Sequence, residues 1–161
     1  LILYSPNIAI NDPNAWLLNN PWGLSIARMV KKSDYITVDN KGETYARYWN
    51  TKYRLEAAVE LQEFIERTMV ASTFSKIQQP LLVLYYYRDE KNQDPVVRVD
   101  AMKEMFAQVT TASNKKRMIA IPNAGAHVLA SPIVSKDIKT VQEQTAIFLK
   151  QVIGLKEKSI N

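Results

Sequence analysis

The sequence predicts an α/β protein with a parallel sheet of about three strands and helices on both faces. Three short apolar segments have the length of strands, at residues 1–4, 81–87 and 118–121. The unbroken apolar run of the middle segment is typical of a strand that is covered on both faces. Helical patterns separate the segments, and this alternation favours a parallel sheet with right-handed crossover connections.

The first connection is predicted to contain several helices. Asp12-Pro13 is a helix start signal, and a short helix is expected after it. A second helix is expected over residues 24–32, whereas residues 33–50 show turn signals and weak periodicity and are left irregular. Residues 51–72 contain no Gly or Pro and place apolar residues along a broad face, which predicts a long helix.

Two further helices are predicted after the second and third strands. The pair Asp94-Pro95 opens one whose apolar residues recur at helical spacing, and the aspartate is itself a good N-cap. Ser135 can cap a final helix that Gly154 ends. We therefore predict one domain over residues 1–154, followed by a frayed tail over residues 155–161.

Composition excludes several classes of function. The 161 residues are 47% hydrophobic and 23% charged, which is ordinary for a globular protein. The net charge of +5 is dispersed, and its largest cluster, residues 115–117, is interpreted as the solvated start of a strand rather than a nucleic-acid site. No Cys and a single His argue against thiol catalysis and a metal site, and no apolar run reaches the roughly 20 residues of a membrane span. The compartment is left open.

The candidate chemistry lies in the loops after the second and third strands. Neighbouring parallel strands end at the same edge of a sheet, so Asp94 and the only histidine, His127, are expected to meet there. A carboxylate at that place would orient the imidazole and stabilise its protonated form. Asp89 is a second candidate for the acid. The alternatives are a purely capping role for Asp94 and a solvent-exposed or satisfied loop histidine.

This arrangement resembles the C-terminal half of the α/β-hydrolase superfamily. The run Asp94-Pro95-Val96-Val97 is similar to the family's acid loop, and residues 123–127, Asn-Ala-Gly-Ala-His, are similar to its histidine loop. Residues 1–6 look like the strand that follows the nucleophile-bearing helix. The resemblance implies a partial α/β-hydrolase fold that carries the acid, Asp94, and the base, His127, of a Ser-Asp-His triad. It also implies a substrate with an ester or amide bond, as for an esterase, lysophospholipase or peptidase.

One departure from the family pattern bears on activity. The nucleophile elbow Gly-x-Ser-x-Gly is absent, since no serine stands between two of the four glycines at that spacing. Ser5, before Pro6, is interpreted as a turn residue. Because the nucleophile elbow is absent, we expect the chain to be inactive alone, and because it begins inside an apparent strand, we expect it to be part of a longer protein. Residues 13–72 correspond to the family's lid, and their aromatic residues are expected either to cover an apolar pocket or to pack on the sheet.

A second hypothesis is a binding or assembly module on the same fold. In the family's strand order, the opening strand Leu1–Tyr4 lies beside the nucleophile strand, which this sequence does not contain. Its edge is therefore expected to be unpaired and to bind the missing N-terminal half or a second copy. A nucleotide-binding fold is disfavoured, because neither Gly-x-Gly-x-x-Gly nor a P-loop follows any strand, and no cofactor is expected.

Overall fold

The computed structural model describes residues 1–38 and 42–156 and divides the chain into two compact units. Unit 1 consists of Leu1–Ala9 and Val70–Asn161, and unit 2 is Ile10–Met69. The lid-like segment expected over residues 13–72 covers most of unit 2. Of the predicted tail, Leu155 and Lys156 lie outside any helix or strand, and residues 157–161 are outside the described residues.

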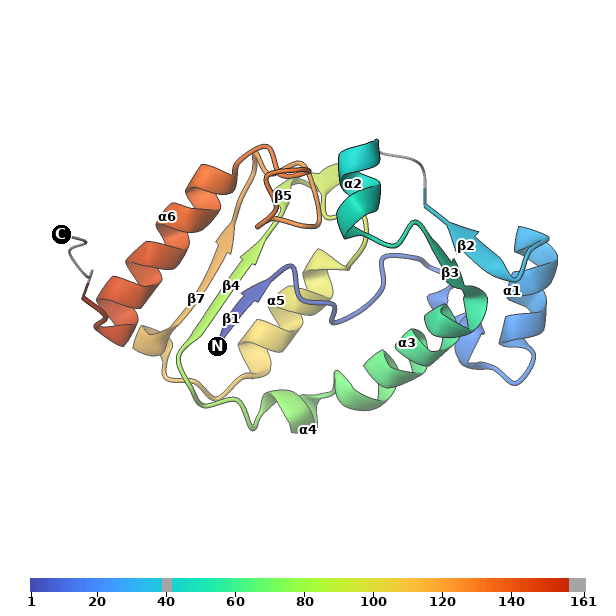
Figure 1. Ribbon diagram of the computed structural model, residues 1–161. Helices are drawn as coiled ribbons and strands as arrows, with labels where there is room; N and C mark the ends of the chain where they lie inside the picture. The colour runs from blue at the N-terminus through green and yellow to red at the C-terminus, as the bar shows by residue number, and fades with distance from the viewer. Residues whose placement is uncertain (39–41, 157–161) are drawn as a thin grey trace. The chain divides into compact units, whose positions relative to one another are not determined.

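Unit 1 is built on a three-stranded parallel sheet (Figure 1). Its strands are β1 (Ile2–Tyr4), β4 (Leu81–Tyr85) and β7 (Lys116–Ala120), in the order β1-β4-β7. Both neighbouring pairs are parallel, with Val83 of β4 opposite Leu3 on one side and Met118 on the other. The prediction of an α/β protein with a three-stranded parallel sheet is therefore confirmed.

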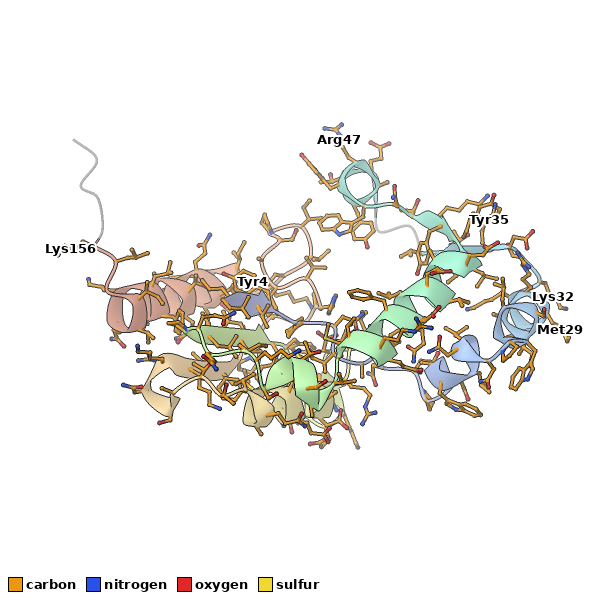
Figure 2. The ribbon with its side chains drawn as sticks, turned by 90° about the horizontal axis from the view of Figure 1, so that it is seen from below. Tyr4, Met29, Lys32, Tyr35, Arg47 and Lys156 are labelled. Carbon is orange, nitrogen blue, oxygen red and sulfur yellow. The ribbon has the colours of Figure 1, made fainter. Side chains whose placement is uncertain are left out.

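Helices cover both faces of the central strand. Every residue of β4 is buried. Leu82 and Leu84 pack in one cluster with Val141 and Phe148 of α6 (Ile138–Phe148). Because side chains alternate along a strand, the remaining residues of β4 face the other way. There Figure 2 places α5 (Val99–Gln108), whose two methionines are buried, on the side of β4 opposite to α6.

The connections after β4 and β7 differ from the predicted ones. The chain forms a hairpin directly after β4, with β5 (Tyr87–Asp89) paired to β6 (Asn92–Gln93). The expectation that Asp94 caps the next helix is wrong, because α5 begins five residues later, at Val99. Likewise Asp137, and not Ser135, caps α6 by accepting a hydrogen bond from the Thr140 amide.

The remaining elements of unit 1 are short. They are α4 (Ala71–Phe74), η2 (Ser113–Lys115) and one π-helical turn, η3 (Leu149–Ile153). The π-helical turn continues α6 and ends at Gly154, as the sequence predicts. Gly154 adopts a left-handed φ of 77°, which an L side chain rarely takes.

Unit 2 contains mainly helices and one small antiparallel sheet. Its elements are η1 (Ala15–Asn19), α1 (Gly23–Lys31), β2 (Tyr35–Thr37), α2 (Glu43–Tyr48), β3 (Lys52–Arg54) and α3 (Leu55–Thr68). The prediction that residues 33–50 are irregular is wrong for β2 and α2. The predicted long helix starts later than expected because residues 52–54 pair with β2 instead.

Close packing and a charge network join the elements of unit 2. Gly23, at the start of α1, is buried so tightly that a Cβ there would lie 2.2 Å from the carbonyl oxygen of Leu17. Arg28 binds both Asp34 and Glu56 at 2.8 Å. The hydrogen bond from Arg54 is the largest of several effects that lower the pKa of Glu56 to about 2. Gly23 therefore permits the contact between α1 and η1, and the charges connect α1 to α3.

None of the helices in the described part of the chain has both the length and the apolar character needed to cross a bilayer.

Candidate functional site

The acid loop holds the carboxylate of Asp94 at the end of the β5–β6 hairpin. Its backbone amide donates to the carbonyl oxygen of Tyr86 at 3.1 Å, which returns the chain to the end of β4. Its Oδ1 accepts hydrogen bonds from the amides of Val96 and Val97 at 2.9 and 3.1 Å. The side chain is completely buried. Asp94 therefore stabilises the turn that leads to α5 rather than the helix itself.

The histidine loop is anchored on both sides of His127. The amide of Ile121 donates to the carbonyl oxygen of Tyr85 at 2.8 Å, which extends the pairing of β4 and β7 beyond the last strand residue. Ala124 before the histidine and Leu129 after it are both fully buried in the cluster beneath α6. These anchors fix the position at which the loop crosses the edge of the sheet.

The two loops bring the predicted pair together. Nδ1 of His127 lies 2.9 Å from Oδ2 of Asp94, and 28% of the His127 side chain is exposed. An ionised carboxylate only accepts hydrogen bonds, so Nδ1 carries the proton and Nε2 is the ring nitrogen with the free lone pair. Nε2 has no hydrogen-bond partner among the described residues. The imidazole is thus held by a buried acid and keeps its second nitrogen for an external group.

Hydrogen bonds keep Asp94 ionised despite its burial. Burial is the largest influence on this carboxyl group and acts to raise its pKa. The hydrogen bond with His127 and the amides of Val96 and Val97 act in the opposite direction, and together they lower the pKa of Asp94 below its ordinary value. Asp94 is therefore a carboxylate at neutral pH, as an orienting acid requires.

Arg88 connects the two loops and was missed by sequence reasoning. Its Nε donates to the carbonyl oxygen of Pro122 at 3.1 Å, and its terminal nitrogen donates to Oδ1 of Asn123 at 3.0 Å. Arg88 lies on β5, in a charged run that is typical of a solvated loop. No local signal in the sequence distinguishes it from a surface arginine, because both of its partners are about 35 residues away.

Asp89, the second candidate for the acid, binds its own hairpin turn. Its carboxylate accepts hydrogen bonds from the amides of Lys91 and Asn92 and from the side chain of Asn92, all at 2.9 Å. The side-chain bond from Asn92 is the largest influence that lowers the pKa of Asp89. Of the two carboxylates, the structure brings only Asp94 to the imidazole.

Ser5 lies at the same edge of the sheet but makes no bond to the histidine. Its amide donates to the carbonyl oxygen of Leu84 at 2.8 Å, so Ser5 extends the pairing of β1 with β4. Its φ is 43°, and its buried hydroxyl has no hydrogen-bond partner among the described residues. A serine nucleophile requires a base within hydrogen-bond reach, and Ser5 lacks that contact.

The described residues contain no group of three or more His, Cys, Asp or Glu side chains arranged to hold a metal ion. A scan against protein-family models finds no match for this chain, and a search of curated proteins finds none either. The geometry of the Asp94 and His127 pair suits general base catalysis, in which Nε2 of His127 takes a proton from a nucleophile while Asp94 stabilises the resulting imidazolium.

Proposed function

We propose that this chain supplies the acid and the base of a serine hydrolase of the α/β-hydrolase type, acting on an ester or amide bond. Asp94 is the acid and His127 the base, and the nucleophile is provided by residues outside these 161. The observation that carries the proposal is the 2.9 Å contact between Nδ1 of His127 and a fully buried, ionised Asp94 at the carboxyl edge of a parallel sheet.

The strand order supports the hydrolase type of fold. The acid loop follows the middle strand, β4, and the histidine loop follows the outer strand, β7. In the family that the sequence resembles, acid and base come in that order along the chain and β1 lies beside the nucleophile strand. In the structure β1 is an edge strand, so the position of such a neighbour is vacant among the described residues. The backbone groups of Ile2 and Tyr4 would meet it there.

Esterase activity tests the proposal most directly. The protein expressed from the full reading frame is expected to hydrolyse p-nitrophenyl butyrate, and the 161-residue chain alone is not. Replacing the acid with Asp94→Asn should lower kcat/KM by on the order of 10³–10⁴-fold, because the imidazole loses its orienting partner. Asp89→Asn is the matched control, since that carboxylate contacts only its own turn, and its kcat/KM should stay within about twofold.

Three results would contradict the proposal. They are a full reading frame without hydrolytic activity, equal losses for the two aspartate variants, and activity of the 161-residue chain that His127→Ala abolishes. The last result would place a nucleophile within this chain.

Nuclear magnetic resonance tests the geometry of the pair without needing activity. Because the chain has one histidine, its imidazole signals need no assignment. We expect a hydrogen-bonded Nδ1 proton far downfield in the wild-type chain and in Asp89→Asn. The signal should be shifted upfield or lost to exchange in Asp94→Asn. A wild-type tautomer with its proton on Nε2 would rule out the assigned roles.

A second candidate function, assembly through the edge of β1, rests on a specific observation. The Leu1 carbonyl and the Ser5 amide bond to β4, and backbone directions alternate along a strand. The amides and carbonyls of Ile2 and Tyr4 therefore point to the side of β1 where no described strand lies. An unpaired edge of this kind is a template for another strand, from the rest of the protein or from a second copy.

Light scattering tests the assembly function. Ile2→Pro removes a donor from the free edge and leaves the bonds to β4 intact, so it should reduce self-association of the 161-residue chain. Ile147→Ser, a change at a partly exposed site on α6, is the control and should not. A wild-type chain that stays monomeric at high concentration would exclude self-association, although not pairing with the rest of the protein.

A further inference from the structure

The outward side of α1 is apolar, which is the reverse of an ordinary surface helix. Met29 and Val30 are 74% and 73% exposed, and Trp22 and Ile26, about two turns and one turn before them, are also exposed. Scattered apolar residues are common on protein surfaces, but a continuous exposed patch usually marks a binding site. We call these four residues the α1 face.

Helix geometry makes the α1 face continuous. At about 100° per residue, the four positions fall within a sector of about 100° around the helix axis. Gly23, which is buried against η1, lies at the border of this sector, and the side beyond it packs on η1 and α3. Ser25, at the other border of the sector, is exposed and small. Figure 2 shows Met29 and Lys32 near each other at the outer side of α1.

Positive charge borders the α1 face. Lys32, directly after the helix, is exposed and lies near Met29, whereas Lys31 falls about 150° around the helix axis from the middle of the face. The sequence contains no acidic residue between Asp12 and Asp34. Arg28 is occupied by Asp34 and Glu56. Lys32 makes no ion pair among the described residues, so its charge is available to a partner bound at the α1 face.

We propose that the α1 face binds the surface of a lipid bilayer that contains anionic headgroups. Trp22, Ile26, Met29 and Val30 enter the boundary between headgroups and acyl chains, and Lys32 contacts lipid phosphates. The nine residues of α1 span only about 13 Å, so the helix lies in the plane of the interface rather than across it. The proposal is independent of the hydrolase chemistry proposed for unit 1.

A bilayer fits this surface better than a protein partner does. Stable protein interfaces use roughly 20–30 residues on each side, whereas the α1 face offers four. An interfacial helix needs only an apolar face with Trp and aliphatic residues and basic residues beside it. The α1 face consists of Trp and aliphatic residues, and the positive charge beside it has the sign that anionic lipids attract.

Vesicle sedimentation of the 161-residue chain tests the proposal. The wild-type chain should bind vesicles of phosphatidylcholine and phosphatidylglycerol, and binding to pure phosphatidylcholine should be much weaker. Met29→Ser with Val30→Ser should lower the partition coefficient at least tenfold. Lys32→Gln should lower it about fivefold, and high salt should cancel that difference, whereas Lys31→Gln should lower it less because Lys31 lies on the far side of the helix. Ile147→Ser on α6 is the control and should bind as the wild type does.

Tryptophan quenching gives a second measurement that keeps the α1 face apolar, because phenylalanine replaces Trp22. Brominated lipids should quench the wild-type chain, and Trp22→Phe should remove more of that quenching than Trp49→Phe. No binding to anionic vesicles, or equal binding of the serine double variant with retained helical circular dichroism, would overturn the proposal. So would a stable dimer that the double variant dissociates, because the α1 face would then bind a second copy.

Discussion

Two apolar elements, β4 in unit 1 and α1 in unit 2, differ in how far their side chains are buried. In unit 1 the whole of β4 is buried between two helices, and the loops of Asp94 and His127 are anchored to that core. In unit 2 Met29 and Val30, the most exposed large apolar residues in the described part of the chain, lie on the outer side of α1. The same kind of residue therefore supports stability in one unit and is available for binding in the other.

Apolar side chains have two different roles here: they hold a site rigid, or they remain exposed for binding. A pair such as Asp94 and His127 must be held to within a fraction of an ångström, which requires rigid supports on both loops. A membrane-binding helix needs its apolar face uncovered, and the free energy that burial would have contributed is not available to the fold. We therefore expect truncation of a buried residue of β4 to lower the free energy of unfolding much more than truncation of a residue of the α1 face.

Truncation of core and face residues provides the strongest test of this comparison. Leu82→Ala should lower the free energy of unfolding by about 3–5 kcal/mol, because the fully buried side chain leaves a cavity next to α6. Met29→Ala should change it by less than about 0.5 kcal/mol. Urea titrations can follow the His127 resonance for unit 1 and tryptophan fluorescence for unit 2, which contains all three tryptophans. Losses of equal size would show that the α1 face is part of a core.

The sequence predicted the framework of unit 1 because its signals are local. The apolar run at residues 81–85 has no polar interruption, and a strand covered on both faces requires that pattern. Unit 2 was predicted less well. Its strands β2 and β3 are three residues each, and their pairing across about 15 residues of sequence leaves no periodicity to detect. The β5–β6 hairpin was missed because its strands are only three and two residues long.

The order of the predicted strands was enough to predict one part of the candidate site. That Asp94 and His127 would meet followed from two parallel strands ending at one edge of the sheet. The contact of Arg88 with Pro122 and Asn123 did not follow, because it depends on the direction of a hairpin that the sequence does not reveal. The role of Asp94 in its turn was mistaken for helix capping, since Asp before Pro is a signal for both.

Acid titration provides a second test, with a smaller expected effect. The pKa of Asp94 is lower in the folded chain than in the unfolded one, so its carboxylate stabilises the fold fully above the unfolded pKa of about 3.9. That contribution is lost as the pH falls through the folded pKa. At pH 7 we therefore expect Asp94→Asn to be less stable than the wild type by about 2 kcal/mol.

The pH dependence distinguishes loss of this charge from general damage to the fold. The difference between the wild type and Asp94→Asn, measured by urea unfolding, should shrink as the pH is lowered below about 4. Asp89→Asn is again the control, because its exposed carboxylate should give a much smaller difference at pH 7. A difference for Asp94→Asn that stays constant down to the lowest pH would mean that the carboxylate is not ionised in the folded chain.

Two glycines in unit 1 provide the smallest and most local test. Gly125 and Gly154 both adopt left-handed φ angles, and a Cβ at either position would meet no backbone atom closer than 3.9 Å. Alanine at each site should therefore destabilise the chain by about 1 kcal/mol through backbone strain alone. Only Gly125→Ala should alter the Nδ1 proton signal, because Gly125 lies two residues before His127. Gly125→Asn should restore that signal, since asparagine tolerates the left-handed region. If Gly154→Ala changed the signal equally, the strain would spread through the unit, and the rigid supports inferred for the histidine loop would be wrong.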